Sequence, residues 1–153
     1  MKRILLVIVA LGTAALACGT PSTSPESQST APRAMDMEQY TNDSIMYADN
    51  VIEALLAVAD EAETGNAGSV MAVCVAYLPD VIRASNWAER TTPPSSMDAS
   101  HRHLTRGLAL MEESFDACAN GDFDRAVDMM ERGALEIEKA ADAVPQSYND
   151  TSL

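Results

Sequence analysis

Apolar residues recur at alternating spacings of three and four along the chain from Met35 onward. This spacing is typical of helix faces that pack against other helices. The pattern falls into four stripes, separated by short segments that contain Gly, Asn or Pro. Runs of β-branched residues are short, and no stretch predicts a strand. The pattern therefore predicts an all-α domain of four helices over residues 35–146.

Each stripe is the face that we expect one helix to bury. The first consists of Ile45, Ala48, Ile52, Leu55, Ala59 and Ala62. The second consists of Val70, Cys74, Tyr77, Val81, Ala84 and Ala88. The third consists of Met97, His101, Leu104, Leu108, Met111, Phe115 and Cys118. The fourth consists of Phe123, Ala126, Met130, Gly133, Ile137, Ala140 and Val144.

Residues that stop or cap helices lie between these stripes. The expected helix ends are marked by Thr64-Gly65-Asn66, by Ser95 or Ser96, by Asn120-Gly121, by Asp122 and by Pro145. Pro79 lies inside the second stripe and should kink or split that helix, because proline removes a backbone donor. The connections are short, so neighbouring helices should be antiparallel and form an up-down-up-down four-helix bundle.

The two halves of the domain resemble each other in layout. A shift of 56 residues places Gly65-Asn66 on Gly121-Asp122 and the first helical hairpin on the second. The domain could be two duplicated hairpins, or two hairpins of equal length that align by chance. Residues 147–153 are polar, and we expect a disordered tail there.

The N-terminal segment predicts export. Met1-Lys2-Arg3 is a basic head, and Ile4 to Ala17 is an uncharged stretch that ends in Ala15-Leu16-Ala17 before Cys18. This stretch is shorter than the roughly 20 apolar residues that span a bilayer. It fits a signal peptide over residues 1–17. Cleavage by the general signal peptidase would release a secreted or periplasmic soluble protein.

Residues 1–34 resemble the export and anchoring region of bacterial lipoproteins. A small residue precedes Cys18, as in the lipobox, although Ala15 stands where that motif usually has Leu. The resemblance implies that Cys18 receives a diacylglyceryl group (palmitate-type acyl chains) and becomes the new N-terminus. Residues 18–34 carry Pro among many Ser and Thr, which is typical of a flexible tether. The expected location is therefore the cell envelope, on a membrane.

Cysteine pairing supports this interpretation. The chain has three cysteines: Cys18, Cys74 and Cys118. Lipidation of Cys18 leaves an even pair, which suits one disulfide in an oxidising compartment. Cys74 lies near the start of the second helix and Cys118 at the end of the third, so antiparallel helices bring both to one end. The alternative is two buried reduced thiols.

The composition excludes some classes of partner. The formal net charge is −13 and the pI is near 4.3, which disfavours nucleic-acid binding and docking to anionic lipid. Acidic residues gather in three clusters, around Asp60-Glu61, Glu112-Glu113 and Asp122-x-Asp124. We interpret them as solvated surface, with Asp122 and Asp124 near a positive helix N-terminus. A weak divalent-cation site and a docking face for a basic partner are the alternatives.

Catalytic motifs are missing from the sequence. It contains no Gly-rich phosphate loop, no C-x-x-C, no Glu-x-x-His for a di-iron centre, and only two histidines. We therefore expect no enzymatic activity and no cofactor.

The histidines are the remaining candidates for a metal site. Met97 and His101 lie one helical turn apart, and with His103, Met35 and Met37 they could offer soft ligands to Cu(I). The alternative for His101 is a core histidine bonded to a neighbouring side chain or carbonyl, with Tyr77 and Asp98 as candidates. His103 is expected in solvent.

Together these features predict a non-enzymatic, lipid-anchored envelope protein. Its acidic helical bundle would mediate protein interaction or act as a spacer, with an envelope protein as partner. The alternative is a periplasmic carrier of copper or of a small ligand.

Overall fold

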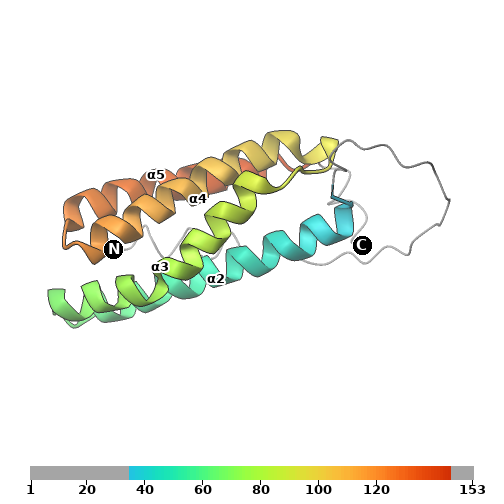
Figure 1. Ribbon diagram of the computed structural model, residues 1–153. Helices are drawn as coiled ribbons and strands as arrows, with labels where there is room; N and C mark the ends of the chain where they lie inside the picture. The colour runs from blue at the N-terminus through green and yellow to red at the C-terminus, as the bar shows by residue number, and fades with distance from the viewer. Residues whose placement is uncertain (1–34, 146–153) are drawn as a thin grey trace.

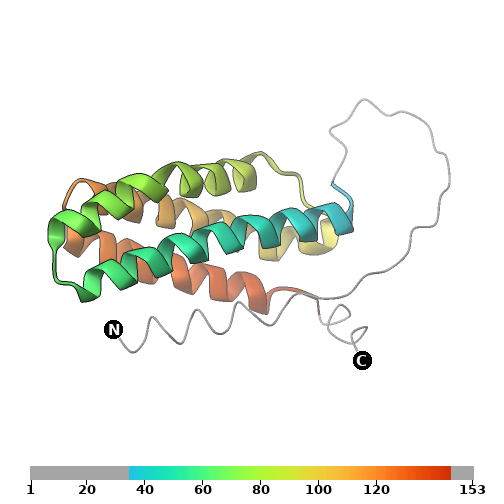
Figure 2. The same cartoon turned by 90° about the horizontal axis from the view of Figure 1, so that it is seen from below.

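The structure is a computed structural model, which describes residues 35–145. Within this range the chain forms four α-helices and one short 3-10 turn, and no strand. The elements are α2 (Met37–Glu63), α3 (Ala67–Arg90), η1 (Ser95–Met97), α4 (Asp98–Ala119) and α5 (Phe123–Asp142). The helices lie alongside one another, and each contacts its neighbour in the sequence (Figures 1 and 2). The predicted all-α class with four helices is confirmed. The predicted signal peptide, Cys18, the tether and the tail lie outside the described residues.

The two tight turns are built alike. Gly65 has φ +70° and is followed by Asn66, whose side chain accepts hydrogen bonds from the first backbone amides of α3. Gly121 has φ +80° and is followed by Asp122, whose side chain accepts from the amide of Arg125. Glycine reaches this left-handed conformation without steric cost, so both helix ends fall where the sequence predicts them. The duplication of the hairpins stays a prediction.

Helix α3 continues through Pro79 and is not split. It changes direction along its length (Figure 1), as expected for a helix that contains a proline. It is also long and apolar enough for a membrane span by length and composition, the one such helix among the described residues. Core helices pass the same test, and α3 buries Cys74, Val81 and Ala84 inside the domain.

The start of α4 differs from the prediction. Neither Ser95 nor Ser96 caps it; they belong to η1, and Met97 occupies the N-cap position without a side-chain bond. The amide of Met97 donates instead to the carbonyl of Pro94 at 2.8 Å. A 3-10 turn thus satisfies a backbone donor that a serine cap would otherwise bind.

The core confirms the stripes of α3 and α4 and corrects the stripe of α2. Val70, Cys74, Val81, Leu108, Met111, Phe115 and Cys118 are among the buried residues. On α2, by contrast, Ala59 and Ala62 are exposed, and the buried residues are Tyr40, Val51 and Ala54. The buried face is rotated because the rings of Tyr40 and Tyr47 pack against Trp87 of α3. Two large rings bury more apolar surface than alanine methyl groups do.

Small residues hold α4 against α5. Three residues of α4, seven apart, face three of α5, also seven apart: Ser100 with Ala140, Gly107 with Gly133, and Ser114 with Ala126. The Oγ atoms of Ser100 and Ser114 each donate to the facing backbone carbonyl at 2.7 Å. A Cβ added at Gly107 would lie only 3.1 Å from the carbonyl oxygen of Gly133. This small-residue seam lets the two backbones approach closely, and residue numbers ascend along α4 as they descend along α5.

A disulfide joins α3 to α4. Cys74 and Cys118 are bonded, with their Cα atoms 5.9 Å apart, and both are buried. The predicted pairing is present in the structure, at the end of the domain that also holds the two tight turns.

Candidate functional site

His101 is a buried side chain whose ring is held by hydrogen bonds. It is 7% exposed, and its Nδ1 lies 3.1 Å from the hydroxyl of Tyr40 on α2. The pKa of His101 is lowered by burial, and this effect is partly offset by the backbone carbonyls of Ala88 and Thr91 at the end of α3 and by the charge of Asp98. The neutral ring can therefore accept from Tyr40 at Nδ1 and donate to α3 from its other nitrogen. Burial also raises the pKa of Tyr40.

The sequence predicts His101 either as a metal ligand or as a core histidine bonded to a neighbouring side chain or carbonyl, and the ring is indeed buried. Its side-chain partner is Tyr40, and neither Tyr77 nor Asp98, which the sequence suggested, takes that place. Tyr40 precedes the first predicted stripe and lies 61 positions from His101. A signal was present in the spacing of Tyr40 and Tyr47, which are two turns apart on one face of a helix.

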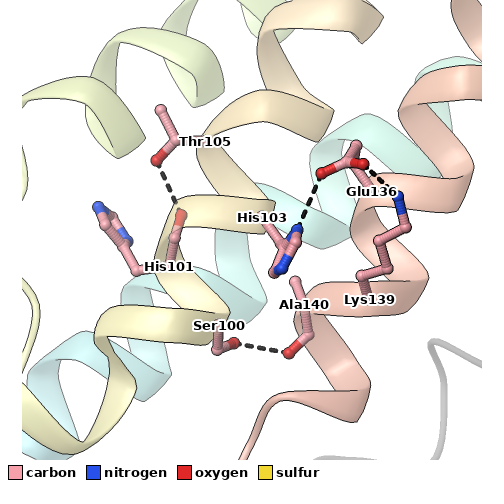
Figure 3. Close-up of polar contacts among 7 residues, drawn as sticks. All are labelled: Ser100, His101, His103, Thr105, Glu136, Lys139 and Ala140. Atoms are coloured by element: carbon pink, nitrogen blue, oxygen red, sulfur yellow. Dashed lines mark hydrogen bonds and ion pairs between the residues drawn. The ribbon is translucent and has the colours of Figure 1, made fainter.

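The sequence predicted that His103 lies in solvent, and this is wrong. Its side chain is half-buried against α5. Its Nδ1 lies 2.9 Å from Oε2 of Glu136, whose other oxygen accepts from Nζ of Lys139 at 2.5 Å. Hydrogen bonds from Lys139 and His103 lower the pKa of Glu136 to about 2. Figure 3 shows His103 pointing towards Glu136 while His101 points away from α5. The sequence missed Glu136, because this pair depends on how α4 and α5 face each other.

The residues proposed for copper are not brought together as one open site. Met97 and His101 are both buried near the start of α4, but Nδ1 of His101 lies in the hydrogen bond with Tyr40. His103 points in another direction (Figure 3). Among residues 35–145, no group of three or more His, Cys, Asp or Glu side chains is arranged to hold a metal ion. The predicted acceptor of the lipid, Cys18, lies outside that range.

A surface groove runs between α4 and α5, which we call the α4–α5 groove. Its volume is about 420 Å³, and it is lined by Arg106, Ala109, Leu110, Arg132, Leu135, Glu136 and Lys139. Leu135 is 55% exposed, so the lining of the groove presents apolar surface to solvent. Arg132 pairs with Asp128 at 3.4 Å and Lys139 with Glu136, both within α5.

This groove is lined by three cations and one carboxylate, Glu136, and therefore carries a net positive charge on an acidic protein. The chain has 10 Lys and Arg against 23 Asp and Glu, and three of the basic residues line the groove. A ligand that combines apolar groups with negative charge would therefore complement it. The sequence could not locate this groove, because Arg106 and Arg132 come together only through the packing of α4 on α5.

The acidic clusters take part in local structure. Asp122 caps α5, as the sequence predicted, through a 3.3 Å hydrogen bond from the amide of Arg125. Arg125 also pairs with Glu113 across the turn at 3.6 Å. Both partners are more than half exposed, so this ion pair adds little stability.

Compared with protein-family models, with curated proteins and with solved structures, this chain matches none of them.

Proposed function

We propose that this protein is a non-enzymatic, lipid-anchored component of the cell envelope whose helical domain binds another envelope protein. The observation that carries the proposal is the α4–α5 groove. Its exposed leucine and its three cations lie on a domain that is otherwise strongly acidic. Exposed apolar surface rimmed by polar groups is typical of protein-interaction sites.

The chemistry of the groove defines the partner. Leu110 and Leu135 offer apolar contacts. Arg106 offers charge-assisted hydrogen bonds, and Arg132 and Lys139 offer the donors that their pairs with Asp128 and Glu136 leave free. A helical segment with an apolar stripe flanked by Asp or Glu residues fits this groove. Its apolar side chains would contact the leucines, and its carboxylates would pair with the cations. The partner is therefore an acidic amphipathic segment, and the charged rim would set its orientation.

The domain that presents this groove is proposed to be an up-down-up-down four-helix bundle. The facing pairs Ser100–Ala140 and Ser114–Ala126 support opposite directions for α4 and α5. The Cys74–Cys118 bond joins the start of α3 to the end of α4, which supports the same relation for that pair. The tight turn at Gly65 supports it for α2 and α3.

Anchoring at Cys18 is part of the proposal. Support comes from the resemblance of residues 1–34 to lipoprotein precursors and from the pairing of the two remaining cysteines. A buried disulfide suits a compartment outside the reducing cytoplasm. The proline-containing tether would hold the domain away from the membrane to which the lipid attaches.

Partner binding is tested by capture from native membranes under mild crosslinking. The bait is the full chain, either unchanged or as the double variant Arg106→Gln, Arg132→Gln. The matched control is Arg83→Gln, Arg90→Gln, which removes the same charge from another face. We expect the first variant to recover at least fivefold less of a defined partner and the control to recover it fully. Equal loss with both variants, or no reproducible partner with the unchanged chain, would refute this function.

The anchor is tested separately by the intact mass of the protein from native membranes. We expect an N-terminal Cys18 that carries acyl chains, and two fewer hydrogens at Cys74 and Cys118 than in the reduced form. The variant Cys18→Ser should appear in the soluble fraction. An unmodified Cys18 after cleavage would instead identify a secreted or periplasmic soluble protein.

A further inference from the structure

A second groove lies on the opposite pair of helices, between α2 and α3. Its volume is about 460 Å³, and it is lined by Tyr47, Arg83, Asn86, Trp87, Arg90 and Thr91. Open grooves of this size accommodate part of a small molecule. None of these residues belongs to the α4–α5 groove, so this site goes beyond the protein interaction proposed above.

One wall of the groove is aromatic and fixed in place. The ring of Tyr47 stacks on Trp87 with centroids 5.0 Å apart and planes at 27°. Trp87 is held in turn by Tyr40 at 5.9 Å and by the edge of His101 at 6.3 Å. A packed cluster of this kind keeps its rotamers, so a ligand ring would meet a wall that needs little ordering.

The indole nitrogen of Trp87 is closed to solvent. Nε1 is buried and has no hydrogen-bond partner among the described residues, the one side-chain nitrogen or oxygen there of which this is true. Buried donors in native proteins are ordinarily satisfied. Because Nε1 is closed to the surface, a ligand in the groove packs against the indole ring and does not bond to this donor.

The other wall is positively charged. Arg83 and Arg90 are seven residues apart on α3, which places them on one face about two turns apart, and Asn86 lies between them. Arg83 pairs with Asp80. Within residues 35–145, Arg90 takes part in no ion pair. Guanidinium groups bind carboxylates through two parallel hydrogen bonds.

We propose that the groove between α2 and α3 binds a small molecule that combines a ring with a carboxylate. The ring packs against Tyr47 and Trp87, and the carboxylate pairs with Arg90 and Arg83. An aromatic acid and a sugar acid share this chemistry, since both present a ring face and an anion. The groove is open to solvent, so we expect dissociation constants between about 10 µM and 1 mM, near the lower end of specific affinities.

The test uses the intrinsic fluorescence of Trp87, which is the single tryptophan of the chain and lines this groove. The disulfide-bonded protein is titrated with phenylacetate and with glucuronate, and with benzyl alcohol and glucose as uncharged matches. We expect saturable quenching or a spectral shift with at least one acid, and binding at least tenfold weaker for its uncharged match. The acid that binds identifies the ligand class.

Two double variants, each of which removes two positive charges, distinguish binding at this groove from a general effect of net charge. Arg83→Gln, Arg90→Gln should weaken binding at least tenfold, whereas Arg106→Gln, Arg132→Gln should leave it unchanged. A circular dichroism melt establishes that both remain folded. Equal weakening in both variants, equal binding of acid and alcohol, or a linear response to every probe would each overturn the proposal.

Discussion

His101 connects three helices through one imidazole ring. It belongs to α4, shares a hydrogen bond with Tyr40 of α2, and lies near the carbonyls of Ala88 and Thr91 at the end of α3. Burial lowers its pKa, so the ring is neutral in the folded protein under conditions in which an exposed histidine begins to protonate. A titratable side chain thus serves as a structural connector.

Removing the Tyr40 hydroxyl should destabilise the domain. Tyr40→Phe leaves the buried Nδ1 of His101 without its hydrogen-bond partner, at a cost of about 1–2 kcal/mol in the free energy of unfolding. Urea denaturation followed by circular dichroism measures this loss. The control is Tyr47→Phe, which keeps a ring stacked on Trp87 and should change stability by less than about 0.5 kcal/mol. Equal effects would show that the 3.1 Å contact contributes nothing.

The lowered pKa of His101 predicts a dependence of stability on pH. The ordinary pKa is 6.5, and the folded value lies below it, so the unfolded chain takes up the proton first as the pH falls. The contribution of His101 is therefore complete above about pH 6.5 and decreases as the pH falls towards the folded pKa. Denaturation midpoints between pH 7 and pH 5 measure the slope. We expect a smaller slope in His101→Gln, and an unchanged slope there would contradict the assignment.

At the scale of helix pairs, the small-residue seam decides how closely α4 and α5 approach. A Cβ at Gly107 would lie 2.6 Å from Cγ1 of Ile137 and 3.1 Å from the carbonyl of Gly133. The side chain of Ile137 can rotate, but the backbone of α5 can move only by separating the helices. The distance between α4 and α5 is therefore set at this glycine pair.

Gly107→Ala should destabilise the protein by about 1–3 kcal/mol, because overpacking outweighs the gain in helix propensity. Thermal and urea unfolding measure the change. The matched control is Gly68→Ala in the exposed first turn of α3, where an added Cβ meets only the Asn66 side chain at 3.4 Å. That variant should be neutral or slightly more stable, and a stabilised Gly107→Ala would show that the helices tolerate a wider separation.

Loss of the Cys74–Cys118 disulfide should destabilise the protein. The disulfide closes a loop with a sequence separation of 44 residues, so its loss should lower the free energy of unfolding by up to about 4 kcal/mol. The variant Cys74→Ser, Cys118→Ser is compared with the unchanged protein in urea, with and without dithiothreitol. The reductant should reproduce the variant's loss in the unchanged protein and should not affect the variant. A loss below about 0.5 kcal/mol would contradict a stabilising role.

For the whole molecule, net charge is the dominant electrostatic feature. A formal charge of −13 on a protein of 16.3 kDa produces self-repulsion in the compact state. Ion pairs on the surface offset little of it, because most are exposed and lie within one helix. Salt should therefore stabilise this protein by screening.

Raising NaCl from about 20 mM to about 200 mM should increase the melting temperature at pH 7 by several degrees, since the Debye length falls below the spacing of many surface charges. Differential scanning calorimetry measures the shift. At a pH near the pI of 4.3 the net charge vanishes, and the same change in salt should have almost no effect. A melting temperature that falls with salt at pH 7 would mean that local ion pairs outweigh the net repulsion.

Local chemistry in the sequence determined the helices themselves. Glycine with positive φ next to Asn66 and Asp122 fixes two helix ends, and the stripes of α3 and α4 follow from helical periodicity. The pairing of Cys74 with Cys118 also followed, because it requires only the order and length of the helices. The helix ends and the stripes depend on residues that are near one another in the chain, and the disulfide depends on the order of the helices.

Tertiary structure alone decided the relations between helices. The face that α2 buries, the donor to His101, the Glu136 partner of His103 and the two arginine-lined grooves all depend on how one helix is rotated against the next. Neighbouring faces of an alanine-rich helix differ little in hydrophobicity, so periodicity does not fix that rotation. Large rings and close backbone contacts fix it, and their energy exists only once the helices have met.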